Sequence, residues 1–214
     1  MSRLACWILA VAALGPGAVA ASESAVIRGG GLSFPDPFLG LGEALELVGT
    51  VDPGTSKAPF AFDSSLEYTW VVYGPVVYSV EEPVEGIRYM SLTFGVVEIR
   101  EDPSINAAFD ADPPNAVVPS AFHDGAALLL GSVTELRIRD IFGIVTATGV
   151  IRFEAGNALP LLGESVEWTF NAGVSLFGPE VPSGYSAHWA VEASPVTPVG
   201  VQSKSWSSIK SLYR

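Results

Sequence analysis

The chain has 214 residues, with 23 acidic against 11 basic side chains and a formal net charge of −12. An acidic surface does not attract nucleic acids or anionic membranes, so the composition argues against both as partners. The only cysteine is Cys6, so the chain beyond it has no thiol for a disulfide, a metal or nucleophilic catalysis.

Residues 1–20 are predicted to be a signal peptide. Arg3 supplies a positive start, 4–14 is an unbroken apolar run, and 18–20 (Ala-Val-Ala) are small residues suited to signal peptidase. A bilayer span takes about 20 apolar residues, so this run is too short, and no later segment supplies a transmembrane span. We therefore expect a secreted protein, extracellular or on the cell surface, that begins at Ala21.

Apolar and polar residues alternate with a period of two along much of the chain, which is typical of strands with one buried face. The first strands are predicted at 43–51 and 66–73. A third lies at 89–99, where the apolar phase shifts by one residue at Gly95 and predicts a β-bulge. Further strands are predicted at 126–131, 133–140 and 144–154.

The most regular alternation covers 165–177, with Trp168 and Phe170 on its apolar phase. It returns at 185–192, after a turn at 179–184, so these two strands are predicted to pair as a hairpin. The short strands, 16 prolines and 22 glycines predict an all-β fold, specifically an antiparallel, jelly-roll-like β-sandwich over 21–194. A closed barrel is the alternative.

The proline-rich stretch 102–120 is predicted to be a surface loop, and it is the best candidate for a metal site. Carboxylate and amide oxygens are the ligands that calcium prefers. The candidate ligands are Glu101, Asp102, Asn106, Asp110, Asp112 and Asn115. Their spacing matches no calcium-binding pattern, and Asp, Asn and Pro also favour turns. The prediction therefore favours a solvated loop without a cofactor, with calcium as the alternative.

Four aromatic residues in the first half of the chain, Trp70, Tyr73, Tyr78 and Tyr89, are candidates for a sugar-binding platform. Aromatic faces stack on the apolar faces of pyranose rings. Trp168 and Trp189 lie on the apolar phase of their strands and are assigned to the core instead.

Catalytic residues are not predicted, because no catalytic motif is found and no pattern brings His123 and His188 together. A pair of outward strand carboxylates, as a glycosidase uses, stays open as a further alternative.

Residues 195–214 form a proline-containing linker and a basic tail. Its apolar residues Trp206, Ile209 and Tyr213 fall on one face of a short amphipathic helix, with Lys210 and Arg214 near the helix C-terminus. Such a helix is marginal alone and needs a partner surface, so we assign these residues to docking. A frayed terminus is the alternative.

The run Ser-Trp-x-x-Ile-Lys-x-x-Tyr-Arg at 205–214 resembles short C-terminal tails of varied secreted bacterial proteins. The body resembles uncharacterised secreted bacterial β-rich proteins through the pieces 101–103, 113–115, 122–125 and the Leu-Leu-x-Gly end of a strand near Gly131. The resemblance implies an exported location and a sorting role for the tail, and no catalytic residues.

The sequence thus predicts a secreted or surface-displayed, non-enzymatic β-sandwich that acts as a structural or interaction module, with a protein or cell-surface partner for its tail. A carbohydrate-binding module that uses the exposed aromatics is the alternative, and a carbohydrate-active enzyme comes third.

Overall fold

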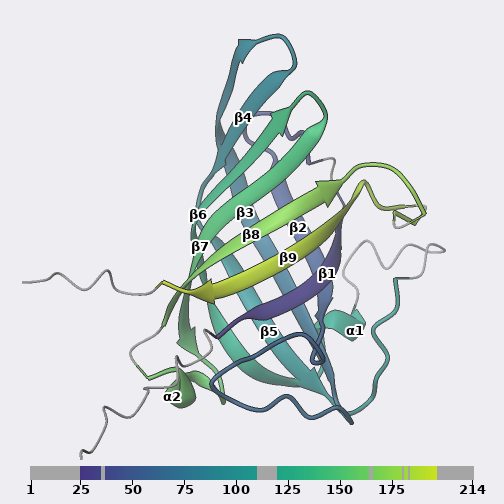
Figure 1. Ribbon diagram of the computed structural model, residues 1–214, viewed down its shortest axis with the longest axis vertical. Coiled ribbons are helices and arrows are strands. Elements are labelled where there is room, and N and C mark those ends of the chain that lie inside the picture. The colour runs from purple at the N-terminus through teal and green to yellow at the C-terminus, as the bar shows by residue number, and fades with distance from the viewer. Residues whose placement is uncertain are drawn as a thin grey trace, which may run out of the picture.

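The computed structural model describes residues 25–34, 37–109, 120–163, 166–179, 181–182 and 184–196. Within them the chain forms strands and two four-residue helices (Figure 1). In chain order these are β1 (Ile27–Ser33), β2 (Ala44–Val51), β3 (Glu67–Val84), β4 (Ile87–Leu92), β5 (Gly95–Asp102), α1 (Ser120–His123), β6 (Ala126–Ile141), β7 (Ile144–Ala155), α2 (Leu159–Leu162), β8 (Glu167–Ser175) and β9 (Ala187–Pro195).

The strands form one antiparallel sheet that closes on itself. Strand β1 pairs with β2 on one side and with β9 on the other, so Gly31 lies opposite both Gly49 and Trp189. The closed ring is β1-β2-β3-β5-β6-β7-β8-β9, and β4 occupies the upper part of the space between β3 and β6. The predicted all-β antiparallel class is confirmed, but the predicted β-sandwich is wrong. The fold is the eight-stranded barrel, because the pairing of β1 with β9 leaves no free edge in the ring.

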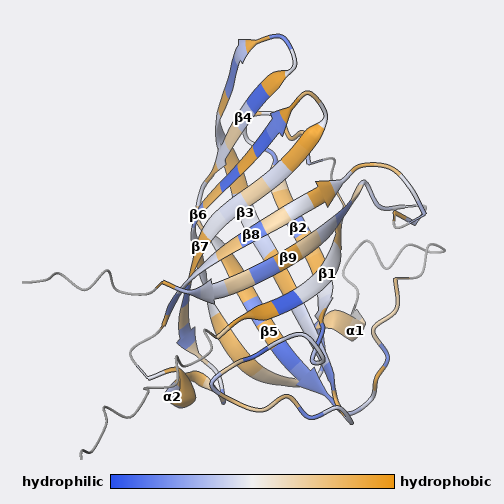
Figure 2. Ribbon diagram, viewed as in Figure 1, coloured by the Kyte–Doolittle hydropathy of each residue, from blue (hydrophilic) through white to orange (hydrophobic). Residues whose placement is uncertain are grey.

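The inward positions of the barrel are apolar and the outward positions are mostly polar. Along β8, Trp168, Phe170, Ala172 and Val174 are buried, and the residues that alternate with them face outward. Figure 2 shows the accompanying change between hydrophobic and hydrophilic residues along the strands. The same face contains Trp189 of β9, which is fully buried. The predicted phase of both strands is therefore confirmed, and their hairpin pairs from Trp168 opposite Pro195 to Ser175 opposite His188. The buried layer is the barrel interior instead of the space between two sheets.

Glycines on β1 and β2 make room for the indole ring of Trp70. A Cβ atom added at Gly31 or Gly49 would overlap that ring. Trp70 is only 8% exposed, and its Nε1 donates to the Thr50 carbonyl at 3.3 Å. The glycine-rich strand β1 was not predicted, because glycine disfavours strands and supplies no alternating side chain. Its glycines are nevertheless needed where a large aromatic side chain approaches the backbone.

A second apolar cluster lies on the outer face of β1, β2 and β3. Outward-facing Leu32, Val48 and Val71 are covered by Phe122 of α1 and by Tyr185, and all five side chains are buried. The Thr69 hydroxyl also donates to the Phe122 carbonyl at 3.0 Å, which fixes α1 to β3. This flank of the barrel therefore has apolar side chains packed on both faces of the sheet.

Two long hairpins, β3–β4 and β6–β7, rise above the other strands (Figure 1). The predicted strands 126–131 and 133–140 are joined in β6, and β3 continues well beyond the predicted 66–73. The apolar phase does shift near Gly95, since Met90 and Leu92 are buried before it and Gly95 and Val97 after it. The β-bulge predicted inside one strand at 89–99 is nevertheless wrong, because the shift falls at a break between two strands: β4 ends at Leu92 and β5 begins at Gly95.

Candidate functional site

The barrel interior holds only a small cavity. It measures about 60 Å³ and is lined mainly by apolar side chains, among them Trp70 and Trp189. Pockets for organic ligands are typically about 300–1,000 Å³. A candidate ligand site must therefore be sought on the outer face.

The four aromatic candidates for a sugar platform are placed in three different surroundings. Trp70 is buried in the interior, and Tyr73 lies on the outer face near α1, where it contacts Glu98 and His123. Tyr78 and Tyr89 line the same groove. Burial removes Trp70 from the candidate site, and Tyr73 belongs to a separate cluster.

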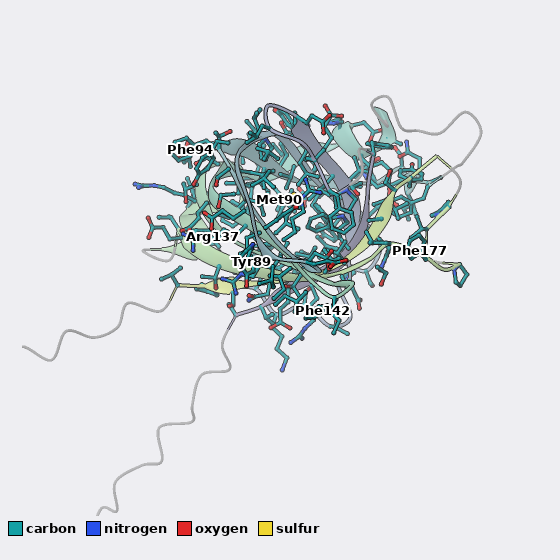
Figure 3. The ribbon with its side chains drawn as sticks, turned by 90° about the horizontal axis from the view of Figure 1, so that it is seen from above. Tyr89, Met90, Phe94, Arg137, Phe142 and Phe177 are labelled. Carbon is teal, nitrogen blue, oxygen red and sulfur yellow. The ribbon has the colours of Figure 1, made fainter. Side chains whose placement is uncertain are left out.

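The groove crosses the outer face of β3, β4 and β6 and has a volume of about 580 Å³. Strand pairing assembles it: Tyr89 lies opposite Glu81 on one neighbour and Arg139 on the other. One step lower, Ser91 lies opposite Ser79 and Arg137. Figure 3 shows Met90 near the centre of the barrel and Tyr89 and Arg137 toward its wall.

Tyr78 lies in the groove beside an irregularity of β3. Val77 pairs with Leu92, but the next pair is Ser79 with Ser91, so one extra residue of β3 stands opposite the β4 backbone. Such a bulge turns a side chain away from the regular alternation. Tyr78, which follows the buried Val77, is 63% exposed, and the bulge puts Ser79 on the outer face as well.

Arg139 differs from the other arginines in the described part of the chain. Those other arginines each form an ion pair with a glutamate, in the pairs Arg28–Glu192, Arg88–Glu82, Arg100–Glu98, Arg137–Glu135 and Arg152–Glu167. The Arg139 side chain forms no ion pair or hydrogen bond with another described residue, and it lies exposed at the groove. The chain has 23 acidic and 11 basic residues, so a guanidinium without a partner among the described acids is notable, and it is available to a ligand.

Above the groove lies an apolar rim at the tips of the raised hairpins. Ile87, Ile141 and Ile144 lie in register across β4, β6 and β7. Phe142, at a φ of 53°, donates its backbone N–H to the Gly86 carbonyl at 2.7 Å and joins the two tips. Ile144 is 71% and Phe142 73% exposed. Large exposed apolar groups beside a groove are typical of an interaction surface.

A second polar cluster lies on the outer face of β3 and β5, beside α1. The Glu98 carboxylate accepts a hydrogen bond from the Tyr73 hydroxyl at 3.0 Å and one from Arg100 Nε at 2.8 Å. His123 Nδ1 lies 3.7 Å from the same carboxylate, and Arg100 also donates to the Gly125 carbonyl. The cluster therefore connects α1 and the turn after it to the barrel wall.

The pKa values in this cluster reflect these contacts. Burial acts to raise the pKa of Glu98, but hydrogen bonds from Arg100 and Tyr73, together with the Arg100 and His123 charges, lower it overall. Burial and the bond to Glu98 raise the pKa of Tyr73. Both oxygens of Glu98 are engaged, so we interpret this cluster as structural.

The predicted metal loop is described only in part. Glu101 and Asp102 end β5, and Asp102 is buried, with one carboxylate oxygen accepting the Ser104 N–H at 2.8 Å. Asn106 instead bonds to Asp124. Asp110, Asp112 and Asn115 lie outside the described residues. In the ranges that the structure does describe, no three acidic, histidine or cysteine side chains are grouped as metal ligands, and calcium stays an untested alternative.

The other predicted functional segments lie outside the described residues. They are the signal peptide at 1–20 with Cys6 and the docking residues Trp206, Ile209, Lys210, Tyr213 and Arg214 of the tail. Strand β9 includes Pro195, the first residue assigned to the linker.

Neither helix found in the described ranges is long and apolar enough to cross a membrane. Comparisons with known proteins gave no matching family model, no matching curated protein and no matching solved structure.

Sequence reasoning missed the two arginines of the groove. The alternation of Leu136, Arg137, Ile138 and Arg139 was a sufficient signal to put both arginines on the outer face of their strand. The sequence did not indicate that β4 would lie beside them, because strand register between distant segments is a property of the closed sheet.

Proposed function

We propose that this protein is an exported, non-enzymatic interaction module that binds its ligand in the outer groove of β3, β4 and β6. The observation that supports this most directly is the convergence of Tyr78, Tyr89, Arg137 and Arg139 on one open groove. Tyrosine and arginine are the residue types that contribute most to binding surfaces, because they combine apolar contact with directed hydrogen bonds.

Two further features support binding at this surface instead of inside the barrel. The interior is filled except for about 60 Å³, whereas the groove offers about 580 Å³. The apolar rim with Ile144 and Phe142 extends the surface upward and adds apolar contact area. The basic tail, by this proposal, would serve sorting or docking after export and would leave the groove free for the ligand.

Binding of the mature protein to arrays of glycans and peptides tests this proposal, with Tyr89→Ala as the groove variant. We expect this substitution to weaken binding of the retained ligand about tenfold or more, since aromatic residues at the centre of an interface dominate its energy. Phe177→Ala is the matched control, because Phe177 is 88% exposed and does not line the groove. Binding that survives Tyr89→Ala, or no binding of any array member, would contradict the proposal.

A further inference from the structure

We propose that the groove of β3, β4 and β6 binds a carboxylate-bearing polysaccharide, in which a uronic acid is flanked by neutral sugars. This inference rests on the proposed function and adds the chemical class of the ligand.

The cationic part of the groove indicates an anionic group on the ligand. Arg139 has no acidic partner among the described residues, and its guanidinium carries a fork of donors that matches a carboxylate. Arg137 lies on the same face of β6, two residues before Arg139 and about 7 Å from it along the strand. It pairs with Glu135 at 2.8 Å, but both side chains are about half exposed. The two arginines therefore fit an extended ligand better than a small free anion.

The aromatic part indicates flat apolar faces on the same ligand. Tyr78 is 63% exposed, and Tyr89 lines the groove beside Arg139. Sugar rings present C–H faces that pack on aromatic rings, and their hydroxyl groups need polar partners at the edge of the contact. Ser79, Ser91 and Glu81 supply such partners in the groove.

The remaining charges limit how acidic the ligand can be. Glu81 lines the groove, and the chain as a whole carries a net charge of −12. A densely charged polyanion would be repelled by this field, whereas isolated carboxylates between neutral sugars meet Arg139 with little repulsion. A single acidic sugar within a neutral stretch therefore matches both the arginines and the surrounding acidic surface.

The test measures binding of the mature protein to glucuronoxylan and to the same polysaccharide after chemical reduction of its carboxyl groups. We expect the native polymer to bind at least about tenfold more tightly than the reduced one, because a hydrogen-bonded charge pair is lost. Arg139→Gln should lower binding of the native polymer by about the same factor and lower binding of the reduced polymer much less, because the reduced polymer has no carboxylate to pair with the guanidinium. Arg152→Gln, outside the groove on the outer face of β7, should change neither.

Three results would overturn the inference. Equal binding of native and reduced polymer that is lost in Tyr89→Ala would show a neutral-glycan site, and the proposed function would stand. Binding of polyglutamate as tight as glucuronoxylan, and unaffected by Tyr89→Ala, would indicate an acidic protein partner instead. No Tyr89-dependent binding of either polysaccharide, together with no array ligand, would remove both proposals.

Discussion

The barrel has outward-facing apolar side chains on two flanks. They are covered by other side chains on one flank and exposed on the other. On β1, β2 and β3, Leu32, Val48 and Val71 are covered by Phe122 and Tyr185 and are buried. On the raised hairpins, Ile141 and Ile144 stay exposed beside Tyr89 and Arg139. Covering apolar area stabilises the fold, so the covered flank contributes to stability. The uncovered flank is the one where we propose binding.

The largest expected effect comes from the covered flank. Phe122→Ala removes a fully buried ring between α1 and the sheet, and we expect a loss of about 3–5 kcal/mol in the free energy of unfolding. Ile144→Ser, on the uncovered flank, should change it by less than about 0.5 kcal/mol. Chemical denaturation of both variants measures the difference. Equal losses in the two variants would mean that Ile144 is covered in the free protein, and that the two flanks do not differ.

The polar cluster that holds α1 should show a pH dependence. Contacts lower the pKa of Glu98 in the folded state, so the stabilisation is complete above the pKa of an unfolded glutamate, about 4.3, and is lost as the pH falls through the lower folded value. Glu98→Gln should therefore cost about 1.5–3 kcal/mol at pH 7 and much less at pH 3.

The control for this variant is Glu167→Gln, whose carboxylate is half exposed and 3.8 Å from Arg152. It should cost less than about 1 kcal/mol at either pH. A loss for Glu98→Gln that is the same at pH 7 and pH 3 would show that its charge does not stabilise the fold.

The interior behind the covered flank is filled, so we expect even one added methyl group there to lower the free energy of unfolding. In Gly49→Ala the new Cβ would overlap both the Trp70 indole and the Gly30 carbonyl, so we expect a loss of about 1–3 kcal/mol. Gly173 of β8 has open space around it, and Gly173→Ala should be neutral or stabilising by up to about 1 kcal/mol. Thermal unfolding of the two variants measures the difference. An unchanged stability in Gly49→Ala would mean that β1 and β2 can move apart enough to accept the added methyl group.

The smallest effect on stability is expected from the tail. Deleting 199–214 should shift the melting temperature very little, because β9 ends at Pro195 and the ring is complete without the tail. The same deletion should change where the exported protein is found, if the tail is read by a sorting or docking component. A drop of several degrees with unchanged localisation would instead mean that the basic tail packs on the acidic body.

The sequence alone determined the strands with clear alternation and the direction of their side chains. Trp168 and Phe170 fall on the buried phase because a period of two assigns faces without knowledge of the partner strand. The break in phase at Gly95 was visible for the same reason. Local patterns of this kind depend only on residues that are close in the chain.

The tertiary structure decided what lies opposite those strands. A sandwich and a barrel require the same alternation, and only the pairing of β1 with β9, about 160 residues apart, closes the ring. Strand β1 could not be recognised in the sequence because its glycines show no alternation. Among those glycines, Gly31 is needed because a Cβ there would overlap the Trp70 ring. Likewise, Tyr89 and Arg139 are unremarkable separately, and they form a candidate site only because β4 and β6 pair in that register. Contacts between distant segments depend on the closed sheet as a whole, which no local pattern specifies.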